Sequence, residues 1–290
     1  MNSLVASRRA RPFSESQKTA LLTLLTDDDP QIYRLVRGEI IALGQPATDW
    51  LRSYSLCDDP VLRRRTREIV AHFERQDADN EFLAFCLSHG DDLDLERGCW
   101  LLAKTQHPDI NVEAYAALLD SFAGDLLEQI DFGGEDESIL AEINDYLYVK
   151  QGFAGNERNY YDPDNSYLNR VVDRRTGNPI SMCMIYLFVA RRLRLPVTGI
   201  GMPGHFVCRF QSSRKEYYID AFNRGRLLSK ADCIRYLQRT AHDYHEKFLS
   251  PISPGRTLLR ICANLHQIYV NLERVEERAR AQRYIVALSK

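Results

Sequence analysis

The sequence predicts an α+β protein in which helical segments flank one small antiparallel sheet. Apolar residues recur at helical spacing from Glu15 to about Tyr148, as they do in amphipathic helices. A helical stretch that begins at Pro179 is then followed by three short segments rich in β-branched and aromatic residues, which is typical of adjacent strands. Residues 256–290 return to helical spacing.

The N-terminal region, residues 14–90, contains two stretches that begin alike. Asp28-Asp29-Pro30 and Asp58-Asp59-Pro60 align, and the alignment also superposes Ile32 on Leu62. An aspartate accepts hydrogen bonds from the free N–H groups of a helix start, and proline loses nothing in the first helical turn. The pattern predicts stacked helix pairs that resemble a HEAT-type repeat, with two ordinary helical hairpins as the alternative.

Residues 91–151 are predicted to form a helical bridge. Its three helical segments are separated by His107-Pro108 and by Gly133-Gly134, which are helix-breaking pairs. The following stretch, up to residue 178, is rich in Gly, Asn, Asp and Tyr, which indicates ordered loops, and a short helix is expected to start near Asn165-Ser166.

Residues 152–250 are predicted to form the core, a helix packed on a small antiparallel sheet. The helix runs from Pro179 to about Leu193, with Asn178 as its N-cap. Three strands are expected in VTGIGM, HFVCRF and YYIDAF, and the polar QSSRKE forms a hairpin connection. Residues 251–290 form a helical hairpin that must pack on the preceding domain, because one hairpin cannot bury its apolar face alone.

Four motifs identify a resemblance that extends from about Leu93 to the C-terminus. They are N-S-Y-L-N at 165–169, G-N-P-I-S at 177–181, P-G-H-F at 203–206 and I-D-x-F-N-x-G at 219–225. Together they resemble the SirB-type family of transglutaminase-like, TPR-containing bacterial proteins. The resemblance implies a transglutaminase/papain-like core and a C-terminal TPR-like hairpin. The sequence departs from the family at Ala221, which replaces a proline, and at Arg224, which replaces a glycine.

The resemblance implies a site made of a thiolate at a helix N-terminus, a histidine on a strand and an aspartate on the next strand. His205 and Asp220 match the last two. The position of the nucleophilic cysteine falls on Pro179, which offers no nucleophile. The nearest substitutes are Cys183, about one helical turn further on, and Ser181. Two interpretations remain for each residue. Cys183 is either a thiol buried in the core or a nucleophile. Ser181 is either a hydroxyl that hydrogen-bonds to the backbone at the helix start or a nucleophile.

The remaining candidate residues lie beside this predicted catalytic set. Asn178 and Ser181 are expected to line the cleft at the helix start, and Asn223 and Arg224 at its mouth. The last two bind a carboxylate or carbonyl, or belong to a solvated turn. The His205–Asp220 pair is functional, or it satisfies two buried polar groups within the sheet.

Two functions remain open at this point. In the first, the protein is a binding or scaffolding module that holds a protein or peptide through its helical repeats and its cleft. In the second, it is a cysteine-dependent acyl transferase or hydrolase in which Cys183 attacks, His205 moves the proton and Asp220 orients His205.

Composition limits the partners of the protein. With 290 residues, 44% of them hydrophobic, and a net charge of −2, the chain is typical of a globular protein and requires neither nucleic acid nor a membrane. Its seven scattered cysteines and the absence of an N-terminal signal predict reduced thiols in the cytoplasm. His242 and His245 lack a third ligand, so we expect no metal, and we expect no cofactor. The oligomeric state stays open.

Overall fold

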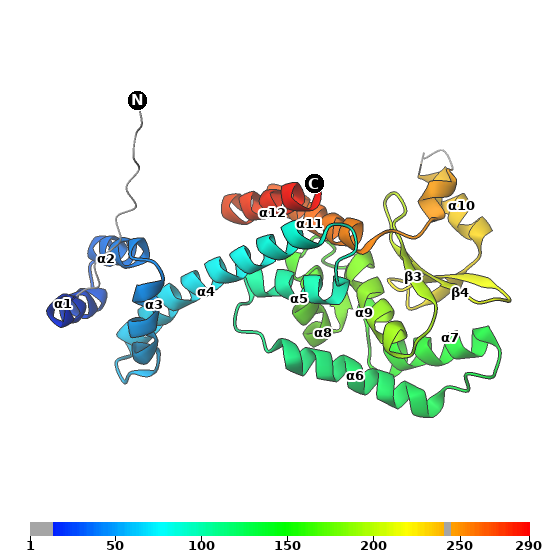
Figure 1. The fold of residues 1–290 in the computed structure, drawn as a ribbon, viewed down its shortest axis with the longest axis horizontal. Coiled ribbons are helices and arrows are strands. Elements are labelled where there is room, and N and C mark those ends of the chain that lie inside the picture. The colour runs from blue at the N-terminus through cyan, green and yellow to red at the C-terminus, as the bar shows by residue number, and fades with distance from the viewer. Residues whose placement is uncertain (1–13, 241–244) are drawn as a thin grey trace. The chain divides into compact units, whose positions relative to one another are not determined.

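The structure is a computed structural model that describes residues 14–240 and 245–290 (Figure 1). The chain divides into two compact units, residues 1–78 and residues 79–290, and each is described by itself. The division falls within the long helix α4 (Pro60–His89). In the described part of the chain, helices predominate and the strands gather in the second unit, so the predicted α+β class is confirmed.

The first unit is helical and has a small apolar core of its own. The two predicted helix starts are confirmed: the Asp29 side chain accepts the N–H of Gln31, and the Asp59 side chain accepts the N–H groups of Val61 and Leu62. The helices that follow have 13 and 30 residues. The HEAT-like repeat therefore stays a prediction. The elements are α1 (Glu15–Leu25), α2 (Pro30–Ala42), α3 (Gln45–Arg52), the 3₁₀ turn η1 (Ser53–Leu56) and the start of α4.

The second unit contains the predicted helical segments, and helix α9 (Pro179–Arg192) lies at its centre. α9 contacts helix α6 on one side and the strands β3 and β4 on the other (Figure 1). The remaining helical elements are α5 (Leu95–Gln106), α6 (Val112–Gln129), α7 (Asp136–Asn144), the π-helical turn η2 (Asp145–Lys150), η3 (Pro163–Asn165), α8 (Leu168–Arg174), α10 (Lys230–Arg239), η4 (Glu246–Leu249), α11 (Pro254–Asn271) and α12 (Val275–Leu288).

The main sheet is antiparallel with the order β3-β4-β5-β6. Its register aligns Gly199, Cys208, Ile219 and Leu227 across the four strands. The three predicted strands and their hairpin connection are confirmed, whereas β6 and a two-stranded parallel pair, β1 with β2, were not predicted. The strands are β1 (Ala154–Gly155), β2 (Thr176–Gly177), β3 (Val197–Ile200), β4 (Val207–Gln211), β5 (Glu216–Asp220) and β6 (Arg226–Leu228).

The two faces of the sheet are buried against different helices. Alternate residues of a strand point to opposite faces. Cys208 and Phe210 of β4 accordingly belong to the large core around α9, while Val207 belongs to a smaller core that includes Leu237 of α10. The sheet is therefore held between α9 and α10, and this arrangement fixes the start of β4, which follows His205, and the end of β5, which carries Asp220.

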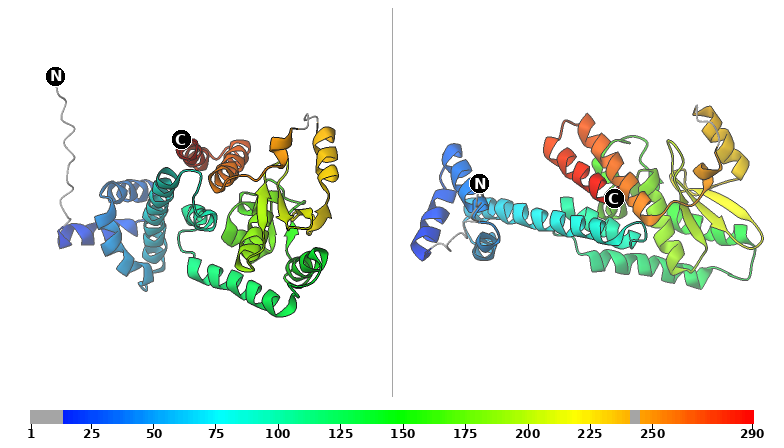
Figure 2. Two further views of the ribbon diagram at one scale, coloured as in Figure 1. Left: turned by 45° about the vertical axis from the view of Figure 1, so that its right-hand side comes forward. Right: turned by 45° about the horizontal axis from the view of Figure 1, so that its top comes forward.

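The C-terminal hairpin packs on the second unit, as predicted. Helices α11 and α12 lie side by side (Figure 2). The hydroxyl groups of Tyr167 and Tyr269 are 2.7 Å apart in the core, and Arg280 donates to the carbonyl of Thr105 at 2.9 Å. Tyr284 donates to Asp79. These contacts establish the hairpin as part of the unit, and its TPR-like character stays a prediction.

A buried ion network holds the C-terminal end of α9. Glu96 of α5 is 5% exposed and accepts two hydrogen bonds from Arg192, at 2.8 and 2.9 Å, and one from Arg191. Arg192 also donates to Asp120 of α6 at 2.5 Å. The hydrogen bond with Glu96 raises the pKa of Arg192 despite its burial. Three helices are thereby joined at one end of the central helix.

None of the helices within residues 14–240 and 245–290 is long and apolar enough to cross a membrane.

Candidate functional site

Two residues of the predicted site, His205 and Asp220, lie together, although His205 lies in the loop before β4 and not on a strand as predicted. Asp220 is the last residue of β5, and β4 begins two residues after His205. The register that pairs Cys208 with Ile219 brings the ends of these strands side by side. His205 Nε2 is 3.1 Å from Asp220 Oδ1, so the carboxylate orients the imidazole.

Asp220 remains ionised although it is buried. Burial opposes its charge, but the hydrogen bond with His205, the charge of His205 and two hydrogen bonds from Asn223 favour it, so the pKa of Asp220 is lowered. The backbone N–H of Asn223 lies 3.2 Å from Oδ1 and its Nδ2 lies 2.8 Å from Oδ2. Asn223 thus stabilises the carboxylate that fixes His205.

A half-buried cation supports the backbone beside His205. Nη2 of Arg260, on α11, donates to the carbonyl oxygens of Met202 at 2.5 Å and of His205 at 2.9 Å. Burial lowers the pKa of Arg260, and no carboxylate within the described ranges forms an ion pair with it. The ring of Tyr236 lies 5.7 Å from the imidazole of His205. The loop before β4 is therefore held by the C-terminal hairpin.

Cys183 lies in the core of the unit. It is 0% exposed, its Sγ donates to the carbonyl oxygen of Phe206 at 3.5 Å, and the Sγ of Cys208 donates to the Cys183 carbonyl at 3.7 Å. Burial raises the pKa of the Cys183 thiol well above its ordinary value, and the neighbouring Cys208 and Asp220 raise it further. A thiol of this kind is protonated at neutral pH.

Asn178 and Ser181 hold the start of α9, as the predicted cap requires. The Asn178 side chain accepts the N–H of Ser181 at 3.0 Å and donates to Ser166 Oγ at 2.9 Å. The Ser181 hydroxyl donates to the carbonyl of Asn165 at 2.6 Å. Both side chains are buried. Their polar groups are therefore used in positioning the helix against the preceding loop.

Asn223 and Arg224 line a pocket of about 450 Å³ next to Asp220. Arg224 has a left-handed backbone with φ of 55°, a conformation that glycine adopts at no steric cost. Residues 154–158 also line the pocket and were not predicted, although the dense polar string GNERN in this segment was a signal. The other lining residues are Ala154, Gly155, Asn156, Glu157, Arg158, Thr176 and Phe222.

The described residues contain no group of three or more His, Cys, Asp or Glu side chains that could hold a metal ion. His242, one of the two histidines considered from the sequence, lies outside the described residues.

Comparison with known proteins identifies the domain that carries this geometry. Residues 113–263, more than half of the chain, match the family model described as transglutaminase-like superfamily. The chain belongs to this superfamily. The transglutaminase-like segment extends from α6 into α11, so it includes His205, Asp220 and Arg260.

The relatives of this transglutaminase-like protein include bacterial and mammalian proteins. A UPF0162 protein of Xylella fastidiosa is 37% identical over 195 residues, which cover 65% of this chain and 69% of the relative. A UPF0162 protein of Pseudomonas aeruginosa is 29% identical over 151 residues, 50% of this chain and 55% of the relative. F-box only protein 21 of mouse is 40% identical over 103 residues, 33% of this chain and 16% of the relative. No solved structure matches the chain.

Proposed function

We propose that this transglutaminase-like protein is a peptide-binding module in which the pocket lined by Asn223 and Arg224, next to Asp220, holds a carboxylate or carbonyl group without catalysing a reaction on it. The observation that carries the proposal is the state of Cys183, which is fully buried and hydrogen-bonded to the backbone. Thiol catalysis needs a thiolate within hydrogen-bond reach of its base.

Ser181, the other candidate near the start of α9, supplies no better nucleophile. Ser181 is buried and its hydroxyl donates to Asn165, so an incoming carbonyl would have to break that bond first. A helix N-terminus lowers a thiol pKa mainly through the free N–H groups of its first turn. Cys183 lies beyond the residues that Asn178 caps.

The pocket beside Asp220 supplies the binding chemistry. Arg158 and Arg224 both line it, and neither has an ion-pair partner in the described part of the chain. A guanidinium group pairs well with a carboxylate through two parallel hydrogen bonds. The side-chain amides of Asn156 and Asn223 provide further donors for a carbonyl oxygen. We infer that an acidic side chain or the C-terminus of a peptide occupies this pocket, and that the helical parts provide additional surface for a protein partner.

The alkylation rate of each cysteine in the folded protein, measured by peptide mass spectrometry over pH 6 to 10, tests the state of the thiol. Cys57 is only partly buried and serves as the internal positive control. Cys183 is expected to stay unmodified until the protein unfolds. Fast alkylation of Cys183 with an apparent pKa below about 8.5, which slows in a His205→Ala variant, would overturn the proposal.

Binding is tested with two matched peptides, acetyl-Ala-Glu-Ala-amide and acetyl-Ala-Gln-Ala-amide, titrated against the protein and followed by amide chemical shifts. The glutamate peptide is expected to bind more tightly, and Arg224→Gln to remove most of that preference. Arg226→Gln is the matched control, because Arg226 is exposed two residues further on and does not line the pocket. Equal affinity for both peptides in the native protein would contradict a carboxylate site.

The alternative, a cysteine-dependent acyl transferase or hydrolase, stays a prediction. The observation that favours it is the 3.1 Å contact between His205 and Asp220, which is the arrangement of a base and its orienting group. The alkylation experiment decides between the two functions, because this enzyme requires a reactive Cys183 thiolate.

A further inference from the structure

Aromatic rings form a continuous row beside the pocket of the proposed function. The ring of Tyr161 contacts that of Tyr160, with centroids 5.2 Å apart, and Tyr160 contacts Phe222 at 6.0 Å. Phe222 in turn lies 6.5 Å from the imidazole of His205, which lies 5.7 Å from the ring of Tyr236. We call these five residues the aromatic row. Phe222 also lines the pocket that is proposed to hold a carboxylate, called the carboxylate pocket below, so the row and the pocket share a wall.

The row combines two accessible rings with one that is firmly packed. Tyr160 and Tyr161 are 40% and 63% exposed, and neither hydroxyl has a hydrogen-bond partner among the described residues. Phe222 packs so closely on Gly155 that a Cβ at that position would lie 2.6 Å from its ring. Exposed tyrosines beside a pocket are typical of an interaction site, because tyrosine offers a large ring at a low cost in conformational entropy.

The charges beside the row favour an acidic peptide over a cation or a nucleic acid. Arg158 and Arg224 line the shared pocket and have no ion-pair partner in the described part of the chain, so a cation on the tyrosine rings would be repelled. A single-stranded nucleic acid also stacks on aromatic rings, but it needs a groove of positive charge along its phosphates. Glu157 lines the same pocket as the two arginines, and the chain has a net charge of −2.

We propose that the aromatic row binds an aromatic side chain of the peptide whose carboxylate occupies the carboxylate pocket. The inference rests on the proposed function, because it names the residue that accompanies the acidic one. Since Phe222 belongs to both the row and the pocket, the aromatic residue of the peptide stands directly before or directly after the acidic residue. Its ring packs against Tyr160 and Tyr161 edge-to-face or offset, as aromatic pairs prefer.

The proposal is tested by titrating three peptides against the protein and following the amide and tyrosine-ring chemical shifts. The reference is acetyl-Ala-Glu-Ala-amide, and acetyl-Phe-Glu-Ala-amide and acetyl-Ala-Glu-Phe-amide carry the aromatic residue on either side. One phenylalanine peptide is expected to bind about fivefold more tightly than the reference, with shifts in the rings of Tyr160 and Tyr161. If neither does, while the glutamate reference still binds more tightly than its glutamine counterpart, the aromatic row is wrong and the proposed function stands. If the phenylalanine peptides bind equally well with glutamine in place of glutamate, the carboxylate pocket is wrong and the pairing proposed here falls with it.

Two matched variants locate the contact. Tyr160→Ala should remove most of the gain that phenylalanine brings, and Tyr161→Ala, which removes the more exposed ring, repeats the test. Phe132→Ala is the control: Phe132 is 42% exposed and contacts no ring of the aromatic row, so the gain should persist. Thermal unfolding checks that each variant is folded. Equal effects of the tyrosine and Phe132 substitutions would overturn the proposal.

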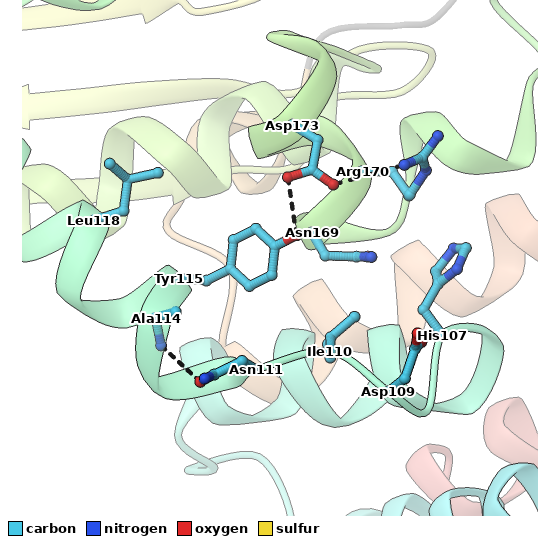
Figure 3. Close-up of a pocket in the computed structure, with 10 residues that line it drawn as sticks. All are labelled: His107, Asp109, Ile110, Asn111, Ala114, Tyr115, Leu118, Asn169, Arg170 and Asp173. Atoms are coloured by element: carbon cyan, nitrogen blue, oxygen red, sulfur yellow. Dashed lines mark hydrogen bonds and ion pairs between the residues drawn. The ribbon is translucent and has the colours of Figure 1, made fainter. Parts of the chain in front are cut away.

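Two further results would place the binding elsewhere. A second pocket, of about 590 Å³, lies between the loop before α6, the first turns of α6 and helix α8 (Figure 3). It is lined by Tyr115 and by Asn169, whose buried Oδ1 has no hydrogen-bond partner among the described residues. Peptide-induced shifts confined to residues 107–115 and 169–173 would mean that the peptide binds there, and would overturn the proposal. Tighter binding of octathymidylate than of either phenylalanine peptide would show that the row stacks nucleic-acid bases, and would overturn it as well.

Discussion

Replacement of Glu96 by alanine should be among the most destabilising single changes in the second unit. The substitution removes three hydrogen bonds to Arg191 and Arg192 and leaves the largely buried guanidinium of Arg192 with only Asp120 and the carbonyl of Phe188 as hydrogen-bond partners. Loss of one member of a buried ion pair costs about 3–5 kcal/mol. Because Arg191 is 55% exposed and Arg192 keeps Asp120, we expect the lower end, about 3 kcal/mol. For a domain of 150–250 residues this corresponds to a fall in Tm of roughly 6–12 °C.

The two tryptophans of the chain allow this prediction to be measured for one unit. Trp100 lies buried in the second unit and Trp50 in the first, so a Trp50→Phe background makes fluorescence report on the second unit alone. Unfolding in urea and by heat then gives the free-energy change. Asp120→Ala is the matched control: Asp120 is 67% exposed, and its loss should cost less than about 1 kcal/mol. If Glu96→Ala costs no more than Asp120→Ala, the buried network is not what holds α9.

Three further changes test the site and its supports. The pKa of Asp220 is lowered in the folded state, so the ionised carboxylate stabilises the fold fully above the unfolded pKa of about 3.9, and this contribution is lost as pH falls through the folded pKa. The difference in unfolding free energy between the native protein and Asp220→Asn should therefore shrink below about pH 4. A constant difference in urea unfolding from pH 3 to 7 would contradict this. Gly155→Ala places a methyl group 2.6 Å from the ring and carbonyl of Phe222, and thermal unfolding should show a loss of about 1–3 kcal/mol. Tyr167→Phe leaves the Tyr269 hydroxyl unpaired and should cost about 1–2 kcal/mol, and the double variant with Tyr269→Phe should cost less than the sum of the single ones in a double-mutant cycle.

The parts of the site that were predictable carry their signals locally. Asn178 before Pro179 specifies a helix start from two adjacent residues, and the structure has the start there. A polar connection between two strand-like segments specifies a hairpin, and a hairpin brings His205 close to Asp220 because its register is fixed by the buried face. In both cases the interacting residues are near each other in sequence.

The parts that were missed depend on distant contacts. Strand β6 has three residues and β1 and β2 have two each, too few to show a period, so only their partners make them strands. Glu96 stands in an ordinary helical pattern, and its arginine partners lie 95 and 96 positions later. The acceptor of Asn169 was likewise invisible, because an unpaired group is recognised only when all its neighbours are known.

Cys183 illustrates a question that the sequence left open for a physical reason. Its position four residues after the first helical residue allowed it to face either the cleft or the core. The choice depends on where the carbonyl of Phe206 lies, and that position is set by a strand that follows the helix. Thiol burial is thus a property of the packed unit.

The hydrogen bonds from Arg260 to the loop that carries His205 limit how this domain can be truncated or transferred to another protein. The segment that matches the superfamily ends at residue 263, inside α11 (Pro254–Asn271). A fragment trimmed to that segment would retain Arg260 on a truncated helix, without Leu265 and Tyr269, which bury α11 in the core, and without α12. The guanidinium of Arg260 would then lose its fixed position, and the carbonyls of Met202 and His205 would lose their hydrogen-bond donor. The smallest fragment that keeps this support therefore includes the C-terminal hairpin. Chimaeras that exchange the hairpin between relatives would also alter the support of the loop that carries His205.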